Sequence, residues 1–264
     1  MCIRDRAYTI MPIELKSEKE LDGMRAAGRI NGEVRAILMK AIEPGITGKE
    51  LDDLATFEIE KRGGIVTFRG YAPGGKPPFP GAICYSVNEE LVHGIPGDRS
   101  LEAGDIVSID MGVTYNGWVS DAAFTSAVGE VSDAANALIN TTRQALLCGI
   151  ESARIGNRLG DISNAIENCS QDYGIVRGYG GHGIGREMHE QPHIPNYGRK
   201  GSGIELMEGM VFALEPMLSV GNPETIELQD QWTVAMQDGS LGAHWEETVA
   251  ITSEGPEVLT QIIE

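Results

Sequence analysis

The feature that most constrains this fold is a pair of β-rich runs, residues 106–115 and 118–125, joined by Asn116-Gly117. Asn-Gly between such runs favours a type I′ turn, because both central residues of that turn need a positive φ. With a two-residue turn, Tyr115 pairs with Trp118. The sequence therefore predicts a long antiparallel hairpin with a fixed register.

That register places two aspartates on one face of the hairpin. Gly112 lies opposite Asp121 and leaves room there, while Asp110 lies opposite Ala123. The two aspartates are then diagonal neighbours, about 7–8 Å apart at Cα. Carboxylates this close repel each other unless they are protonated or bridged by a cation. Two solvated aspartates are the simpler interpretation of the hairpin alone, but the rest of the chain argues against it.

Length and composition exclude several classes of protein. The 264 residues suffice for one large domain or two small ones. A net charge of −18 without a basic run argues against binding along a nucleic-acid backbone. No apolar run reaches about 18 residues, so no membrane span is predicted. The four cysteines have no CxxC spacing, which suits a reducing compartment and argues against a disulfide framework.

Residues 1–10 show no period and lack the apolar run of a signal peptide. Met11-Pro12 would make a plausible start of the chain. We expect residues 1–10 to be extraneous or disordered. Residues 11–264 are then expected to form a single domain.

Helical patterns occur in two pairs. Capping boxes at residues 17–20 and 47–50 begin two helices, and the apolar spacing predicts two more at about 133–151 and 159–173. Strand-like pieces follow each pair: 65–71 and 83–87 flank a Gly/Pro-rich loop at 72–78, and the chain is strand-rich from Gly174.

The two pairs point to an internal repeat. Residues 101–110 fall on residues 206–215, so that Asp110 matches Glu215. Two similar halves, about 11–130 and 131–264, are therefore predicted to be related by a pseudo-twofold axis. Helices followed by antiparallel strands predict an α+β fold with the helices on one side of the sheet.

The second half of the chain contains further candidate residues for a functional site. Residues 178–192 include His182 among many glycines, and their GxGxxG match does not indicate a dinucleotide site, because prolines follow too soon for the required helix. Glu215 ends a buried-looking strand, and Glu246 lies in another strand-like run. Pseudo-symmetry would bring Asp110 towards Glu215 and Asp121 towards Glu246.

Four carboxylates and one imidazole suit Mn, Fe, Co or Zn, and their charge calls for about two divalent cations. Cations about 3.5–4 Å apart activate water and polarise a carbonyl. Taken singly, each carboxylate is more often a salt bridge or a surface charge, and His182 a structural histidine. Taken together, a metal site is the better interpretation.

These residues also carry a family resemblance. The chain resembles type I methionine aminopeptidases, which have the pita-bread fold, over residues 11–264. The matching stretches are Ser86–Pro96, Ile109–Gly112, Ser120-Asp121, Gly181–Glu190, Leu214–Met217 and Trp245-Glu246. The resemblance implies a cytoplasmic, monomeric enzyme that removes methionine from the N-terminus of nascent chains when the second residue is small. The ribosome is an expected partner.

The resemblance also implies roles for individual residues. It gives five metal ligands: Asp110, Asp121, His182, Glu215 and Glu246. His93 and His189 face the substrate, and Glu215 is also the general base. An apolar, polarizable lining suits a thioether. Candidates for the methionine pocket are Phe68, Tyr71, Phe79, Cys84, Met188 and Trp232.

Two departures and two alternatives stand beside this interpretation. Glu247 follows the last ligand where the family usually has histidine, and the loop at 74–78 is longer than usual; His193 and His244 receive no role. A proline dipeptidase or aminopeptidase P shares the fold and ligands, but usually has a further N-terminal domain, whereas only about twenty residues precede the first predicted helix here. A non-catalytic pita-bread binding protein would have a broken ligand set.

Overall fold

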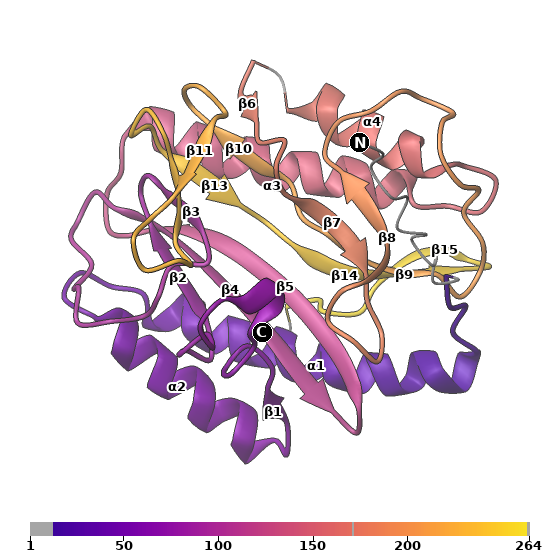
Figure 1. Cartoon of the computed structure of the whole chain (residues 1–264), viewed down its shortest axis with the longest axis horizontal. Coiled ribbons are helices and arrows are strands. Elements are labelled where there is room, and N and C mark those ends of the chain that lie inside the picture. Colours follow the sequence, from indigo (N-terminus) through magenta and orange to yellow (C-terminus); the bar gives the residue numbers. More distant parts are fainter. Residues whose placement is uncertain (1–12, 171, 263–264) are drawn as a thin grey trace, which may run out of the picture.

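The computed structural model describes residues 13–170 and 172–262 (Figure 1). The expectation about residues 1–10 lies outside this part. The helices within it are α1 (Glu18–Ala41), α2 (Gly48–Lys61), α3 (Asp133–Ser152) and α4 (Leu159–Cys169), with a short 3₁₀ turn, η1 (Pro73–Gly75).

The strands of the described residues form four sheets. The first contains β1 (Ile65–Val66), β2 (Cys84–Val87), β4 (Ile106–Tyr115) and β5 (Trp118–Ala127). The second contains β6 (Gly174–Ile175), β10 (Met217–Ser219) and β13 (Gly242–His244). The third contains β3 (Glu90–Val92), β11 (Thr225–Glu227) and β12 (Val234–Met236). The fourth contains β7 (Gly180–Gly183), β8 (Glu190–Pro195), β9 (Val211–Leu214), β14 (Glu247–Thr252) and β15 (Gly255–Val258).

The helix beginnings agree with the sequence. Thr47 and Glu50 form a reciprocal capping box at the start of α2, and at the start of α1 the Ser17 N–H donates to Glu20 Oε2. These bonds satisfy backbone N–H groups that the helix leaves free. The end of α4 differs, because the helix stops at Cys169 and not near residue 173. There the Ser170 hydroxyl donates to a carbonyl in the last turn of the helix and closes it.

The hairpin of β4 and β5 has the predicted register. Tyr115 pairs with Trp118, and Gly112 pairs with Asp121. Asn116 has φ +50° and Gly117 has φ +75°, as the turn requires. The strand predicted at 65–71 is shorter than expected: within this segment, only Ile65–Val66 (β1) forms a strand paired with β4, and the chain turns away after it.

The two halves share backbone details. An isolated bridge pairs Thr47 with Ser100 between the start of α2 and the segment before β4. At the matching place in the second half, Arg158 pairs with Glu205. These equivalent bridges indicate the same local arrangement in both halves, in keeping with the predicted repeat.

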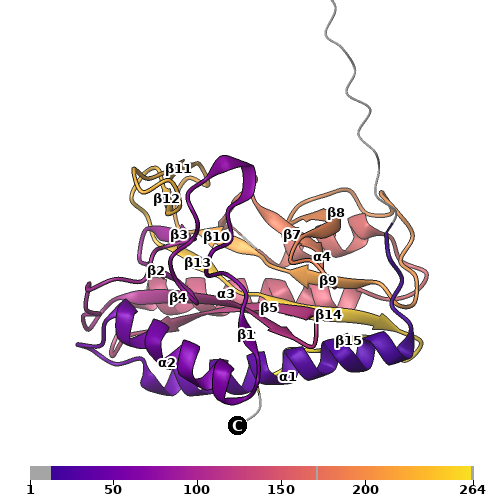
Figure 2. The same cartoon turned by 60° about the horizontal axis from the view of Figure 1, so that its bottom comes forward.

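Helices and strands form layers. Helix α1 contacts β4 and β5, and α3 contacts β10 and β13. Figure 2 shows α1 and α2 below the strands, with η1, β11 and β12 rising on the opposite side. A large core of buried aliphatic residues fills the space between helices and sheets. The result is the predicted α+β arrangement, which leaves one side of the sheets for a site.

The cysteines correct one expectation. Cys148 near the end of α3 and Cys169 at the end of α4 form a disulfide, whereas Cys84 is free and buried. The pair lies 21 residues apart in sequence and meets only because α3 and α4 pack together. In the described part of the chain, no helix is long and apolar enough to cross a membrane.

Candidate metal centre

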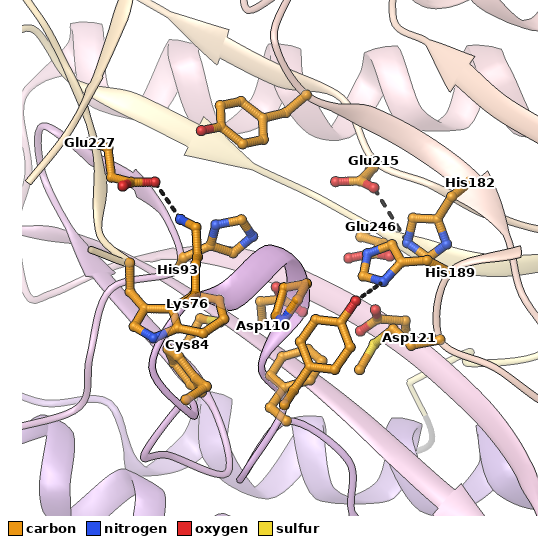
Figure 3. Close-up of a pocket in the computed structure, with 17 residues that line it drawn as sticks. Lys76, Cys84, His93, Asp110, Asp121, His182, His189, Glu215, Glu227 and Glu246 are labelled. Atoms are coloured by element: carbon orange, nitrogen blue, oxygen red, sulfur yellow. Dashed lines mark hydrogen bonds and ion pairs between the residues drawn. The ribbon is translucent and has the colours of Figure 1, made fainter. Parts of the chain in front are cut away.

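Four carboxylates meet where the two halves join. Asp110 lies on β4 and Asp121 on β5, while Glu215 directly follows β9 and Glu246 directly precedes β14. Glu246 and Ala123 exchange both backbone hydrogen bonds, at 3.0 and 3.2 Å, which fixes β5 beside the start of β14. Figure 3 shows Asp121, Glu215 and Glu246 gathered near His182.

The described residues contain two groups whose donor atoms are close enough to share a cation. Asp110, His244 and Glu246 form one, and Asp121, His182 and Glu246 form the other; within each, the donor atoms lie within 4.8 Å of one another. Glu246 belongs to both groups. The arrangement suits two adjacent cations that share a carboxylate.

Three of the four carboxylates have an oxygen without a hydrogen-bond partner in the described part of the chain. One oxygen each of Asp110, Asp121 and Glu246 is buried without a hydrogen-bond partner among the described residues. Burial, followed by the neighbouring carboxylates, raises the pKa of Asp110 and Glu246 well above the usual range. Burial raises the pKa of Asp121 to about 7. Buried, unpaired acids are costly, and bound divalent cations would relieve that cost.

The surroundings of His182 keep its imidazole neutral, as a metal ligand requires. Burial lowers the pKa of its imidazole to about 3. Nδ1 lies 2.9 Å from the Gly183 carbonyl oxygen and donates to it in the neutral ring, which leaves the Nε2 lone pair free. Nε2 lies 3.6 Å from Glu215 Oε1. The donor set therefore fits divalent metals that accept both oxygen and nitrogen.

A cavity of about 450 Å³ opens onto this cluster. Every residue that the sequence suggested for the site lines it: Phe68, Tyr71, Phe79, Cys84, His93, Asp110, Asp121, His182, Met188, His189, Glu215, Trp232 and Glu246. Their distribution is uneven, because the carboxylates occupy one end and the apolar side chains the walls (Figure 3). The structure thus brings these residues together, while their individual roles stay predictions.

The two histidines with predicted substrate roles have different neighbours. His93 has φ +60°, and its ring packs edge-on against Tyr179 and Trp232. Burial lowers the pKa of His93 to about 4, so it is neutral near pH 7. His189 lies nearer the carboxylates: its ring centroid is 4.4 Å from that of His182, and its Nδ1 is 3.0 Å from the Tyr71 hydroxyl.

Gly112 leaves room for the ring of Phe68. A Cβ added there would lie 2.8 Å from Cε1 of Phe68 and 3.0 Å from Cβ of Thr67. The space opposite Asp121 is therefore taken up by the Phe68 ring, one wall of the cavity. The glycine couples the hairpin to the apolar pocket, and the pairing pattern alone could not indicate this.

Sequence reasoning missed several residues of the site. Lys76 and Glu227 form an ion pair at the mouth of the cavity, and Lys76 lies 5.1 Å from the centre of the Trp232 ring. Tyr179 lines the same wall. His244 belongs to one candidate metal group. Only His244 had a usable signal, since it lies two residues before Glu246 and so on the same side of an extended chain.

Glu247, the departure from the family pattern, has a clear partner. Its Oε2 accepts from Arg35 Nη2 at 2.8 Å and also from the Thr260 hydroxyl. Arg35 is fully buried in α1, and its Nη1 lies 3.4 Å from the Glu246 carbonyl oxygen. Glu247 therefore ties α1 to the backbone of the neighbouring candidate ligand.

A pita-bread arrangement with buried carboxylates and an imidazole at the end of an apolar cavity defines a metal-dependent hydrolase. Residues 22–253 match the model of metallopeptidase family M24, and the chain belongs to that family.

Comparison with known proteins indicates the kind of peptidase within this family that the chain most resembles. A methionine aminopeptidase from Clostridium acetobutylicum is 50% identical over 251 residues, which cover 94% of this chain and 98% of that protein. The solved methionine aminopeptidase from Thermotoga maritima superposes with a TM-score of 0.91 at 40% identity, covering 95% of this chain and 100% of that one. The resemblance to methionine aminopeptidases is confirmed.

Dipeptidases with the same fold are less similar to this chain. An Xaa-Pro dipeptidase from Bacillus anthracis has a TM-score of 0.72 at 26% identity. The match covers 93% of this chain but only 61% of that one. The extra length of that protein agrees with the expectation that such enzymes carry a further domain.

Proposed function

We propose that this chain is a metal-dependent aminopeptidase that removes methionine from the N-terminus of peptides and nascent proteins, preferring a small second residue. The observation that carries the proposal is the single cavity that joins a buried carboxylate–imidazole cluster to an apolar wall. The similarity to methionine aminopeptidases over nearly the full chain supports it. The reaction is hydrolysis of the first peptide bond.

The cluster is proposed to hold two divalent cations, chosen from Co, Mn, Fe and Zn. Their proposed ligands are Asp110, Asp121, His182, Glu215 and Glu246. When bound, such cations supply Lewis acidity that activates water and polarises the scissile carbonyl. The unpaired buried oxygens of Asp110, Asp121 and Glu246 support this assignment, because they have no protein partner among the described residues.

Glu215 is the proposed general base. Burial, helped by the charge of Asp121, raises the pKa of its carboxyl well above the usual range, which brings its proton affinity nearer to that needed for proton transfer. His182 and His244 flank it, each with Nε2 3.6 Å from one of its two oxygens. Glu215 thus lies between these two rings and lines the cavity, where Figure 3 shows it beside His182.

His93 and His189 are proposed to hydrogen-bond the substrate and the oxygen that gains charge. Tyr71 positions His189 through its hydroxyl, and the rings around His93 keep that imidazole in place. The methionine side chain is proposed to lie against an apolar wall whose members are Phe68, Tyr71, Phe79, Cys84, Met188 and Trp232. This lining suits a thioether.

Metal-loaded protein incubated with Met-Ala-Ser, formyl-Met-Ala-Ser, Met-Lys-Ser and Gly-Pro tests the proposal, with products read by mass spectrometry. Free methionine should come rapidly from Met-Ala-Ser alone, because a blocked amine is a poor metal ligand and a large second residue fills the cleft. His93→Ala should retain its metals and lose turnover, which separates substrate contacts from metal binding.

The alternatives predict other results. Cleavage of Gly-Pro with Met-Ala-Ser untouched would replace the proposal with a proline dipeptidase. Failure to bind divalent metal would favour a non-catalytic binding protein. We also propose a cytoplasmic monomer that meets nascent chains at the ribosome. Sedimentation of the purified protein tests whether it is a monomer, and sedimentation of ribosome mixtures tests the association with the ribosome.

A further inference from the structure

One buried histidine has no role in the proposed reaction. The chain has five histidines. His93, His182 and His189 line the cavity, and His193 is exposed on β8. His244 is only 1% exposed, and neither of its ring nitrogens has a hydrogen-bond partner among residues 13–170 and 172–262. An imidazole buried in this way needs a partner of some kind.

The ring of His244 faces the carboxylates. Its Nε2 lies 3.6 Å from Glu215 Oε2 and 3.7 Å from Glu246 Oε2. These separations exceed the normal range for a hydrogen bond. Two donor atoms that each lie about 2.1 Å from one cation, in tetrahedral or somewhat wider geometry, are about 3.4–3.6 Å apart. The spacing therefore resembles that of two ligands around one ion.

The same spacing occurs on the other side of the cluster. His182 Nε2 lies 3.6 Å from Glu215 Oε1, and His182 is a proposed ligand. The donor atoms of His244, Asp110 and Glu246 lie within 4.8 Å of one another, as do those of His182, Asp121 and Glu246. Each proposed cation would thus have one carboxylate of the hairpin, the shared Glu246 and one imidazole.

The backbone holds His244 firmly in this orientation. Its N–H donates to the Thr125 hydroxyl oxygen at 2.9 Å, and its carbonyl accepts from the same hydroxyl at 2.8 Å. β13 also pairs with β10, so that His244 lies beside Met217. A side chain fixed by its strand at the cluster is suited to act as a ligand, because little further ordering is needed.

We propose that His244 is a further protein ligand of the metal centre, binding one of the two cations together with Asp110 and Glu246. This inference rests on the proposed two-cation site. Each cation would then have an imidazole nitrogen beside its oxygen ligands. Nitrogen ligands favour Zn, Fe and Co over the harder Mn, so His244 tunes which metal the second position retains.

Histidine nitrogen resonances test the proposal directly. Protein labelled with ¹⁵N in its histidines is compared by long-range ¹H–¹⁵N correlation spectra before and after zinc loading. We expect metal-dependent shifts of the Nε2 signals of both His182 and His244. A shift at His182 alone, with His244 unchanged or protonated at Nε2, overturns the proposal and makes His244 a hydrogen-bonding neighbour. No shift at either ring would refute the metal centre itself.

Metal binding by matched variants gives a second measurement. His244→Gln keeps a polar side chain of similar length, and His193→Gln makes the same chemical change at an exposed position. Calorimetric titration should show the second zinc of His244→Gln weakened by about 10–100-fold, with a smaller loss for Mn. His193→Gln should match the wild type. Equal zinc affinity in all three proteins, each checked for folding by circular dichroism, contradicts the proposal.

Discussion

Glu247 should stabilise the protein through a buried ion pair with Arg35. The Arg35 side chain is 0% exposed and that of Glu247 is 13% exposed, with 2.8 Å between Nη2 and Oε2. In Glu247→Ala, the guanidinium would remain buried and face only the backbone carbonyls of Ala123, Glu246 and Thr260.

The size of the loss follows from that environment. Removing one member of a buried ion pair costs about 3–5 kcal/mol. The remaining carbonyls still accept from Arg35, and Glu247 is partly hydrated, so we expect the lower end, about 3 kcal/mol, for Glu247→Ala. Glu247→Gln keeps the volume and an acceptor oxygen. Its cost should be about 1–2 kcal/mol, because a charge-assisted hydrogen bond becomes a neutral one.

Urea unfolding of chelator-treated protein measures these values without a contribution from bound metal. A double-mutant cycle with Arg35→Met should give a coupling of about 1–3 kcal/mol. Asp22→Ala is the control, because Asp22 pairs with Arg25 but its side chain is 70% exposed. That change should cost less than about 0.5 kcal/mol. An equally small cost for Glu247→Ala would refute the reasoning.

Four further results are expected. Asp110→Asn should reduce metal affinity in calorimetry by about a hundredfold or more while circular dichroism stays native, because it removes charge but little volume. Gly112→Ala should displace the Phe68 ring and raise KM for Met-Ala-Ser about tenfold, with metal stoichiometry unchanged. Cys148→Ser should lower the free energy of unfolding by about 3 kcal/mol in oxidising buffer, and the difference should vanish in reductant. Burial raises the pKa of Asp121 to about 7, above an unfolded value of about 4, so the folded state binds the proton more tightly than the unfolded state. Metal-free protein should therefore lose stability as the pH rises from about 5 to 7. Denaturation curves across that range should show a smaller loss in Asp121→Asn.

The hairpin shows how much of the site the sequence could predict. An Asn-Gly turn sets the register of β4 and β5 by local stereochemistry, so the positions of Asp110 and Asp121 followed by counting. The same reasoning gave the helix starts, because capping boxes are local too. The convergence of Asp110 with Glu215 followed from the repeat, which is a property of the whole chain and still visible in one sequence.

Other features depend on contacts between distant elements. The disulfide requires α3 and α4 to pack in one particular register, and the spacing of Cys148 and Cys169 does not encode it. The partner of Glu247 is Arg35, which lies 212 residues away and is indistinguishable in sequence from any helical arginine. Helix α4 ends early because the Ser170 side chain competes for a backbone carbonyl, and periodicity does not report that competition.

Comparison of the two halves shows where they differ at the cluster. His182 pairs with Ala213, two residues before Glu215, and Ser86 holds the equivalent place opposite Ser108, two residues before Asp110. At the cluster itself, the carboxylates therefore come from both halves, whereas the two imidazoles beside Glu215 both come from the second half. His182 and His244 approach Glu215 from opposite sides, one at each oxygen.

That asymmetry distinguishes Glu215 from its symmetry mate. Asp110 pairs with Cys84 on β2, a side chain with no basic nitrogen. Among the four carboxylates of the described cluster, Glu215 alone has an imidazole Nε2 at 3.6 Å from each of its two oxygens. A scaffold built from two similar halves can thus assign different tasks to equivalent acids. The hairpin acid is suited to hold charge at the cluster, and the acid between the two imidazoles is suited to exchange a proton.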